Sequence, residues 1–124
     1  MSKVPILAVI HADKSIALRV AKFIESSGFA VEVFASAQEF LRSRSIVDTA
    51  CLIIDSNLPG MSGLELQSHL ASASRHIPII FITASSSETD RARALELGAV
   101  DLLHKASGEK ALLKEIRSTL RLRD

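Results

Sequence analysis

The chain has 124 residues, of which 48% are hydrophobic, and its 15 Lys and Arg residues almost balance its 14 Asp and Glu residues, for a formal net charge of +1. This length suits one domain with a single core, and the balanced charge indicates neither a nucleic acid partner nor a membrane partner. The single cysteine, Cys51, excludes an internal disulfide framework and a cysteine zinc site, and we interpret it as a small buried hydrophobic residue. No apolar stretch approaches the ~20 residues of a membrane helix. We therefore expect one cytoplasmic domain over residues 1–124.

Short apolar segments rich in β-branched residues alternate five times with segments of helical period, which is typical of a parallel sheet wrapped by helices. The predicted strands are residues 6–10, 30–34, 51–54, 79–83 and 101–104. The first, third and fourth are almost continuously apolar, as expected for strands that are covered on both faces. The pattern predicts an α/β, flavodoxin-like fold with five helices and a doubly wound five-stranded sheet, most often in the order 2-1-3-4-5.

Helix-start and helix-end signals agree with this division. Residues 36–39 and 62–65 both read Ser-x-x-Glu, which fits a capping box, in which the Ser side chain accepts one backbone N–H and the Glu side chain accepts another. Gly28 can adopt the left-handed conformation that ends a helix. Apolar residues recur at helical spacing in residues 16–24 and 112–120, so the first and last helices are expected to bury one face on the sheet.

Polar residues stand where this fold usually binds a ligand, outside the carboxyl ends of strands 1 and 3. Strand 1 ends in His11, Ala12 and Asp13, and strand 3 is followed directly by Asp55. An acidic residue directly after a buried strand is costly unless it is solvated or paired. Asp55 is therefore a candidate functional residue.

Three motifs resemble those of bacterial two-component response-regulator receiver domains. In LIIDSNLPGMSGLEL (52–66), the pattern Asp-x-x-x-Pro-Gly-x-x-Gly begins at Asp55 and resembles the phosphoacceptor segment of that family. FITA (81–84) resembles the family's fourth strand, and GAVDLLHK (98–105) resembles its fifth strand ending in Lys. Residues 27–41 are similar to receivers attached to helix-turn-helix transcription factors. The resemblance covers essentially the whole chain.

The resemblance implies that Asp55 accepts a phosphoryl group from a histidine kinase or phosphotransfer protein. Lys105 would then provide a fixed cation, Thr83 a hydroxyl for one phosphoryl oxygen, and Ala84 the room for it. Asp55 and the backbone carbonyl of Asn57 would bind magnesium. Such a transfer depends on positioning and on neutralising the charge of the phosphoryl oxygens.

The first strand departs from the family's pattern. Receivers usually carry two adjacent acidic residues where this chain has His11 and Ala12, and the second acid usually binds the divalent ion directly. Magnesium prefers oxygen ligands, so we expect weak magnesium binding. Asp13 is better placed to cap the first helix, with metal binding as its alternative role. His11 lies beside Asp55 in this arrangement, and we expect it to be charged and to replace part of the ion's electrostatic effect.

Two further departures concern the response to phosphorylation. Leu102 stands where the family usually has Tyr or Phe, whose ring moves inward on activation. Ala106 stands where Pro commonly follows the Lys, so a trans peptide bond is expected there.

Two interpretations therefore remain open. In the first, the chain is a working receiver, a signalling domain and not an enzyme, whose Asp55 is phosphorylated weakly or with an altered metal requirement. In the second, it is a phosphorylation-independent pseudo-receiver that serves as a protein docking module. By analogy with the family, an attached or separate output domain and a homodimer through helix 4 and strand 5 are expected, and the chain would be the N-terminal part of a longer regulator.

Overall fold

A parallel β-sheet forms the centre of the computed structural model, which describes residues 6–55, 58, 60–75, 77–83, 92, 95–96, 101–104 and 108–120. Its strands are β1 (Ile6–Ile10), β2 (Ala30–Phe34), β3 (Thr49–Asp55), β4 (Ile79–Thr83) and β5 (Asp101–His104). They lie in the order β2-β1-β3-β4-β5, and every neighbouring pair is parallel. The order of the first four strands agrees with the prediction, and the short β5 pairs with β4 at the edge.

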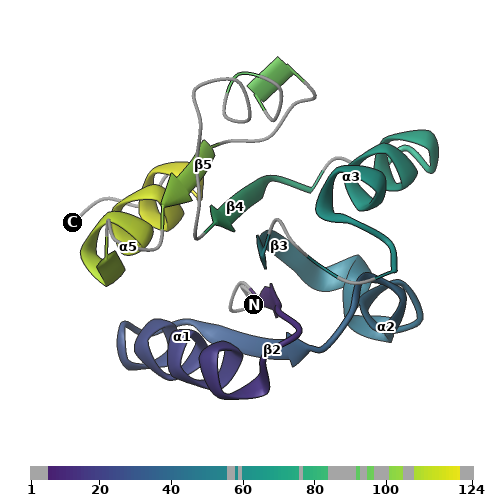
Figure 1. Ribbon diagram of the computed structural model, residues 1–124. Coiled ribbons are helices and arrows are strands. Elements are labelled where there is room, and N and C mark those ends of the chain that lie inside the picture. The colour runs from purple at the N-terminus through teal and green to yellow at the C-terminus, as the bar shows by residue number, and fades with distance from the viewer. Residues whose placement is uncertain are drawn as a thin grey trace, which may run out of the picture.

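Helices cover both faces of the sheet. They are α1 (Lys14–Ser26), α2 (Ala37–Leu41), α3 (Gly63–Ser72), α5 (Gly108–Thr119) and the short 3-10 helix η1 (Arg44–Asp48). Figure 1 shows α1 and α5 on one face and α2 and α3 on the other. The predicted α/β fold with a parallel sheet is therefore confirmed. No helix within the described ranges is long and apolar enough to cross a membrane.

The predicted number of helices is only partly matched. Four α-helices lie in the part of the chain that the structure describes, whereas the sequence predicted five. The fifth was expected between β4 and β5, and most of that segment falls outside the described residues. Ala92, Leu95 and Glu96 are described there and have helical backbone.

The core lies in two layers, because successive side chains of a strand point to opposite faces. One layer packs α2 and α3 on the sheet and includes Phe40, Leu66 and Phe81. The other packs α1 and α5 on the opposite face and includes Ile53 and Ile116. Cys51 also belongs to this second layer and is fully buried, which confirms its interpretation as a small hydrophobic core residue.

Strand β3 is longer than predicted. The sequence predicted residues 51–54, but the strand begins at Thr49 and ends at Asp55. Thr49 pairs with Ile6 of β1, and Asp55 pairs with Ile82 of β4. Pairing with the neighbouring strands thus extends β3 to polar residues at both of its ends. Asp55 is therefore the last residue of a central strand and not the first residue of a loop.

The predicted helix signals are largely confirmed. Ser62 and Glu65 form a complete capping box at the start of α3. Ser36 accepts the backbone N–H of Glu39 at 3.1 Å and caps α2. Gly28 follows α1 with φ of +99°, which is the left-handed conformation that glycine adopts without strain.

Candidate functional site

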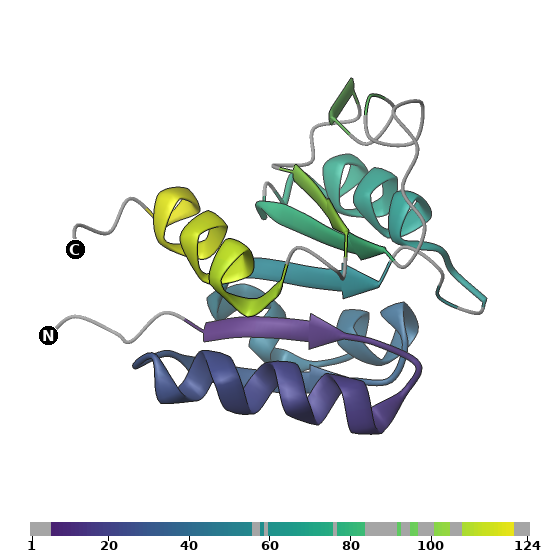
Figure 2. The same ribbon diagram turned by 60° about the vertical axis from the view of Figure 1, so that its left-hand side comes forward.

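The carboxyl ends of three neighbouring strands bring together three of the predicted residues. His11 follows β1, Asp55 ends β3 and Thr83 ends β4. Their exposed fractions are only 6%, 8% and 3%. Because the strands are parallel, their carboxyl ends meet at one edge, as the arrowheads of β1, β3 and β4 show in Figure 2. The three residues thus lie at one edge of the sheet, as the sequence predicted, and their functional roles stay predictions.

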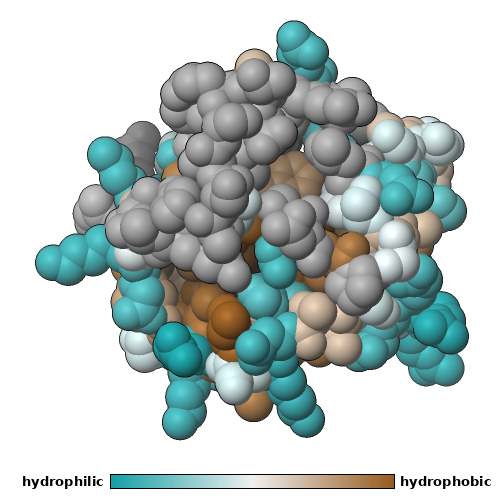
Figure 3. All heavy atoms as spheres, viewed as in Figure 1, coloured by the Kyte–Doolittle hydropathy of each residue, from teal (hydrophilic) through white to brown (hydrophobic). Residues whose placement is uncertain are grey.

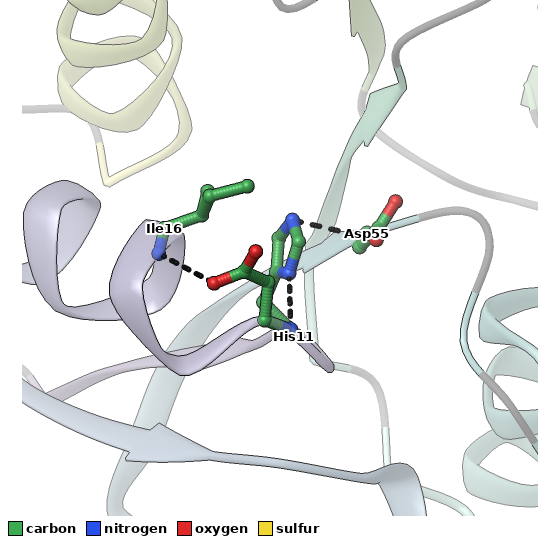
Figure 4. A network of polar contacts seen from close by, with 4 residues as sticks. His11, Ile16 and Asp55 are labelled. Carbon is green, nitrogen blue, oxygen red and sulfur yellow. Dashed lines mark hydrogen bonds and ion pairs between the residues drawn. The ribbon is translucent and has the colours of Figure 1, made fainter.

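His11 and Asp55 contact each other at this edge. The Nε2 atom of His11 lies 3.4 Å from Oδ2 of Asp55 (Figure 4). The backbone N–H of His11 donates to the carbonyl of Phe34 at 3.1 Å, which continues the pairing of β1 with β2 beyond the last residue of β1. This bond fixes the backbone from which the imidazole reaches Asp55.

A second hydrogen bond sets the protonation of the His11 ring. The backbone N–H of Asp13 donates to Nδ1 of His11 at 3.0 Å, so Nδ1 carries a lone pair and not a proton. The ring proton is then on Nε2, the atom that faces Asp55. A charged imidazole would also carry a proton on Nδ1, and this ring N–H would then point at the backbone N–H of Asp13. The geometry therefore favours a neutral His11 whose Nε2 faces the Asp55 carboxyl group, whereas the sequence predicted a charged His11.

The sequence model of the protein family described as the response regulator receiver domain matches residues 7–117 of this chain. The chain belongs to this family. The match includes β3, β4 and all of β1 except Ile6, with the three residues that these strands bring together. It confirms the resemblance seen in the motifs.

Individual relatives agree with the family. The receiver domain is 40% identical to nodulation protein W of Bradyrhizobium diazoefficiens over 111 residues, which cover 90% of this chain and 49% of that protein. It is 34% identical to the transcriptional regulatory protein FixJ of Azorhizobium caulinodans over 112 residues, which cover 90% of this chain and 53% of that protein. The chain spans about half the length of the curated relatives it matches.

A solved structure extends the comparison to three dimensions. The response regulator StyR superposes with a TM-score of 0.86 at 39% identity, over 96% of this receiver and 60% of that chain. A receiver domain from Clostridium thermocellum superposes with a TM-score of 0.87 at 21% identity, over 95% of each chain. The second likeness concerns the fold alone.

Asp13 serves this receiver as a helix cap. Its side chain accepts the backbone N–H of Ile16 at 3.2 Å, and it is the N-cap of α1. Figure 4 shows this bond beside the His11 contacts. Of the two roles left open for Asp13, the structure confirms capping, while its alternative role as a metal ligand stays untested.

The described donors do not fit a magnesium site. No group of three or more His, Cys, Asp or Glu side chains within the described ranges could hold a metal ion. Ala12 has no donor atom, and His11 offers nitrogen where magnesium prefers oxygen. Asp55 is therefore the carboxylate that remains at this edge, and weak magnesium binding stays a prediction.

Several predicted site residues cannot be placed. Asn57, Ala84, Lys105 and Ala106 lie outside the described residues, and their roles stay predictions. Leu102 belongs to β5, but its side chain also lies outside the description.

One glycine near the site has a role that sequence reasoning missed. In the sequence, Gly63 is the last residue of the Asp-x-x-x-Pro-Gly-x-x-Gly pattern that begins at Asp55. In the structure, a Cβ atom at Gly63 would collide with the ring of Phe81 in β4 and lie 3.3 Å from Cγ2 of Ile54. Gly63 therefore allows α3 to start against the sheet. The second glycine of the Pro-Gly-x-x-Gly motif was the signal that could have indicated this contact.

Proposed function

We propose that this receiver domain accepts a phosphoryl group on Asp55 in a two-component phosphorelay. The observation that carries the proposal is the position of Asp55, at the carboxyl end of the central strand β3 in a chain that belongs to the receiver family. The donor would be the phosphohistidine of a histidine kinase or phosphotransfer protein. An oxygen of Asp55 forms the new P–O bond while the P–N bond of the donor breaks. The donor imidazole leaves with the bonding electron pair and takes up a proton.

The neighbours of Asp55 supply the stabilisation that such a transfer needs. His11 holds a neutral Nε2–H against the carboxylate and can donate it to a phosphoryl oxygen. Thr83 ends the adjacent strand with its hydroxyl-bearing side chain buried. Lys105 and Ala84 complete the proposal through the family resemblance. In this proposal, a hydrogen bond from His11 replaces part of the role of a weakly bound magnesium ion.

The second candidate function is a pseudo-receiver, a docking module that works without phosphorylation. It is favoured by the His11–Asp55 contact, because a hydrogen-bond donor already faces the carboxylate where receivers usually have metal-binding acids. In that case the fold would persist as a binding surface, and Asp55 would help to hold β1 to β3.

The proposed partners follow from the family and its relatives. A histidine kinase or phosphotransfer protein would supply the phosphoryl group, and a cytoplasmic location would suit that exchange. Because the chain spans about half of its relatives, one of which is named a transcriptional regulatory protein, we propose an attached or separate output domain. The domain would signal through the surface formed by helix 4, β5 and α5, with dimerisation through helix 4 and β5, without contacting nucleic acid or a membrane itself. It would act as a signalling domain and not as an enzyme.

Incubation with acetyl phosphate tests the two candidates against each other. The wild type and Asp55→Asn are incubated with magnesium or with EDTA, and intact mass is measured. We expect one added phosphoryl group on the wild type, with acetate as the leaving group, and none on Asp55→Asn. If neither protein gains mass from acetyl phosphate or from a panel of phosphorylated histidine kinases, the phosphoacceptor proposal is wrong and the docking module is supported.

A further inference from the structure

A pocket of about 230 Å³ opens between α1 and α5, on the face of the sheet opposite α2 and α3. The carboxyl ends of β1 and β3 lie at its inner end, where His11 and Asp55 contribute to its lining. Figure 3, in the view of Figure 1, shows brown hydrophobic atoms at the surface between the positions of these two helices, with teal hydrophilic atoms beside them. The pocket therefore joins an apolar surface to the candidate phosphorylation site.

Most of the lining is aliphatic. Of 13 lining residues in the described part of the chain, eight are Val, Ile or Leu, four are His, Arg, Asp or Glu, and one is Gly. Val20 of α1 and Leu112 of α5 belong to the aliphatic group, and the strands contribute the floor. Pockets that bind small molecules in proteins have this composition, with an apolar body and a few polar groups that fix orientation.

The polar groups define which end of a ligand goes inward. Arg19 and Glu109 are both exposed, so they lie at the rim, where their opposite charges offset each other. At the inner end, Nε2 of His11 lies 3.4 Å from Oδ2 of Asp55. A carboxylate has about four lone-pair sites and can accept several hydrogen bonds at once. The inner end thus suits a hydrogen-bond donor.

The size of the pocket limits the ligand. An apolar cavity of ~150 Å³ is large enough to hold benzene, so this pocket has room for a ring with one or two substituents. From volume and lining together, we infer that the pocket binds a small molecule with an apolar body and a single hydroxyl group, of the phenol or alcohol class. The hydroxyl donates to Asp55, and the apolar body lies between α1 and α5. This inference goes beyond the proposed function and does not depend on phosphorylation.

Titration of the isotope-labelled domain with phenol, without a phosphodonor, tests the inference by NMR. We expect saturable shifts of the backbone amides of Ile16, Val20 and Leu112 around the pocket, and none at Leu66 and Leu70 on the opposite face. Toluene lacks the donor, and a hydrogen bond to a charged group contributes ~1.5–3 kcal/mol, so phenol should bind at least about tenfold more tightly than toluene.

Matched variants on α1 separate the pocket from the helix surface. Ile16→Trp fills the pocket and should weaken phenol binding at least about tenfold. Leu18→Trp adds the same side chain to the same helix, at a residue that is 49% exposed and outside the lining, and should leave binding unchanged. Val20→Phe is a second filling variant if Ile16→Trp unfolds. The inference fails if phenol produces no saturable shifts, if toluene binds equally well, or if the filling variants bind phenol like the wild type.

Discussion

One imidazole links the start of α1 to the end of β3: Nδ1 of His11 accepts the backbone N–H of Asp13 at 3.0 Å, and its Nε2 lies 3.4 Å from Oδ2 of Asp55. Asp13 in turn caps α1 through Ile16. The segment that usually supplies metal-binding acids in this family is therefore part of a chain of polar contacts. The same short segment therefore contacts both Asp55 and the start of α1.

Restoring the acids should restore magnesium binding. The double variant His11→Asp, Ala12→Asp puts two carboxylates beside Asp55, and magnesium affinity rises with the number of such oxygen ligands. We expect at least a tenfold gain, roughly the lower end of what a single supporting residue contributes at metal sites. Calorimetric titration with magnesium measures the gain. The variant His11→Asn, Ala12→Asn is the uncharged control, and equal affinities in the two double variants would contradict the prediction.

The Nε2–H of His11 should assist phosphorylation without metal. We expect His11→Ala to slow the reaction of Asp55 with acetyl phosphate in EDTA by about tenfold or more, because a hydrogen bond to a charged group contributes ~1.5–3 kcal/mol. His11→Gln keeps an N–H donor and should react faster than His11→Ala. Initial rates from intact-mass time courses provide the comparison. Equal rates in the wild type and His11→Ala would assign His11 a structural role only.

Substitutions of Asp13 can distinguish its role as the cap of α1 from a role as a magnesium ligand. Asp13→Ala removes the side-chain acceptor of the Ile16 N–H and should lower the free energy of unfolding by ~1 kcal/mol. Asp13→Asn keeps a good cap and should stay close to the wild type in urea unfolding. Both variants should leave magnesium affinity unchanged if Asp13 is only a cap. A parallel loss of magnesium affinity in both would identify Asp13 as a ligand instead.

The sequence predicted those features that depend on local pattern. The almost continuous burial of β1 and the apolar run before Asp55 follow from short apolar segments in the sequence, so the strands and the edge at which His11, Asp55 and Thr83 lie could be predicted. The protonation of His11 could not, because it depends on where the backbone N–H of Asp13 points after the turn into α1. Thr49 was missed as a strand residue because its pairing partner in β1 is distant in sequence. The pocket depends on how α1 and α5 pack, which no local pattern records.

Gly63→Ala should destabilise the fold. The added methyl group would collide with Phe81, which is only 1% exposed and has little freedom to move. Overpacking of this kind costs ~1–3 kcal/mol, and we expect a loss of that size in the free energy of unfolding in urea. A matched control is Ser68→Ala, an exposed position on the same helix, which should change little. A stability of Gly63→Ala equal to that of the control would mean that α3 can move away from β4 at little cost.

Cys51 should make stability fall at alkaline pH. Burial raises the pKa of its thiol from 9.0 to about 12, because desolvation disfavours the thiolate. Below pH 9 the thiol is protonated in both states and contributes nothing to the pH dependence. Between pH 9 and about 12 only the unfolded chain loses the proton, so the free energy of unfolding decreases by up to ~1.4 kcal/mol per pH unit.

Cys51→Ala isolates this effect from the lysines, which titrate in the same range in both proteins. The difference in unfolding free energy between the wild type and Cys51→Ala should be constant from pH 7 to 8.5 and should shift against the wild type above pH 9, measured in urea with a reducing agent present. A thiol reagent should modify the native wild type at pH 8 only as fast as the chain unfolds, since Cys51 is fully buried. A pH-independent difference between the two proteins, or rapid labelling of the native state, would show that the interior around Cys51 is open to water.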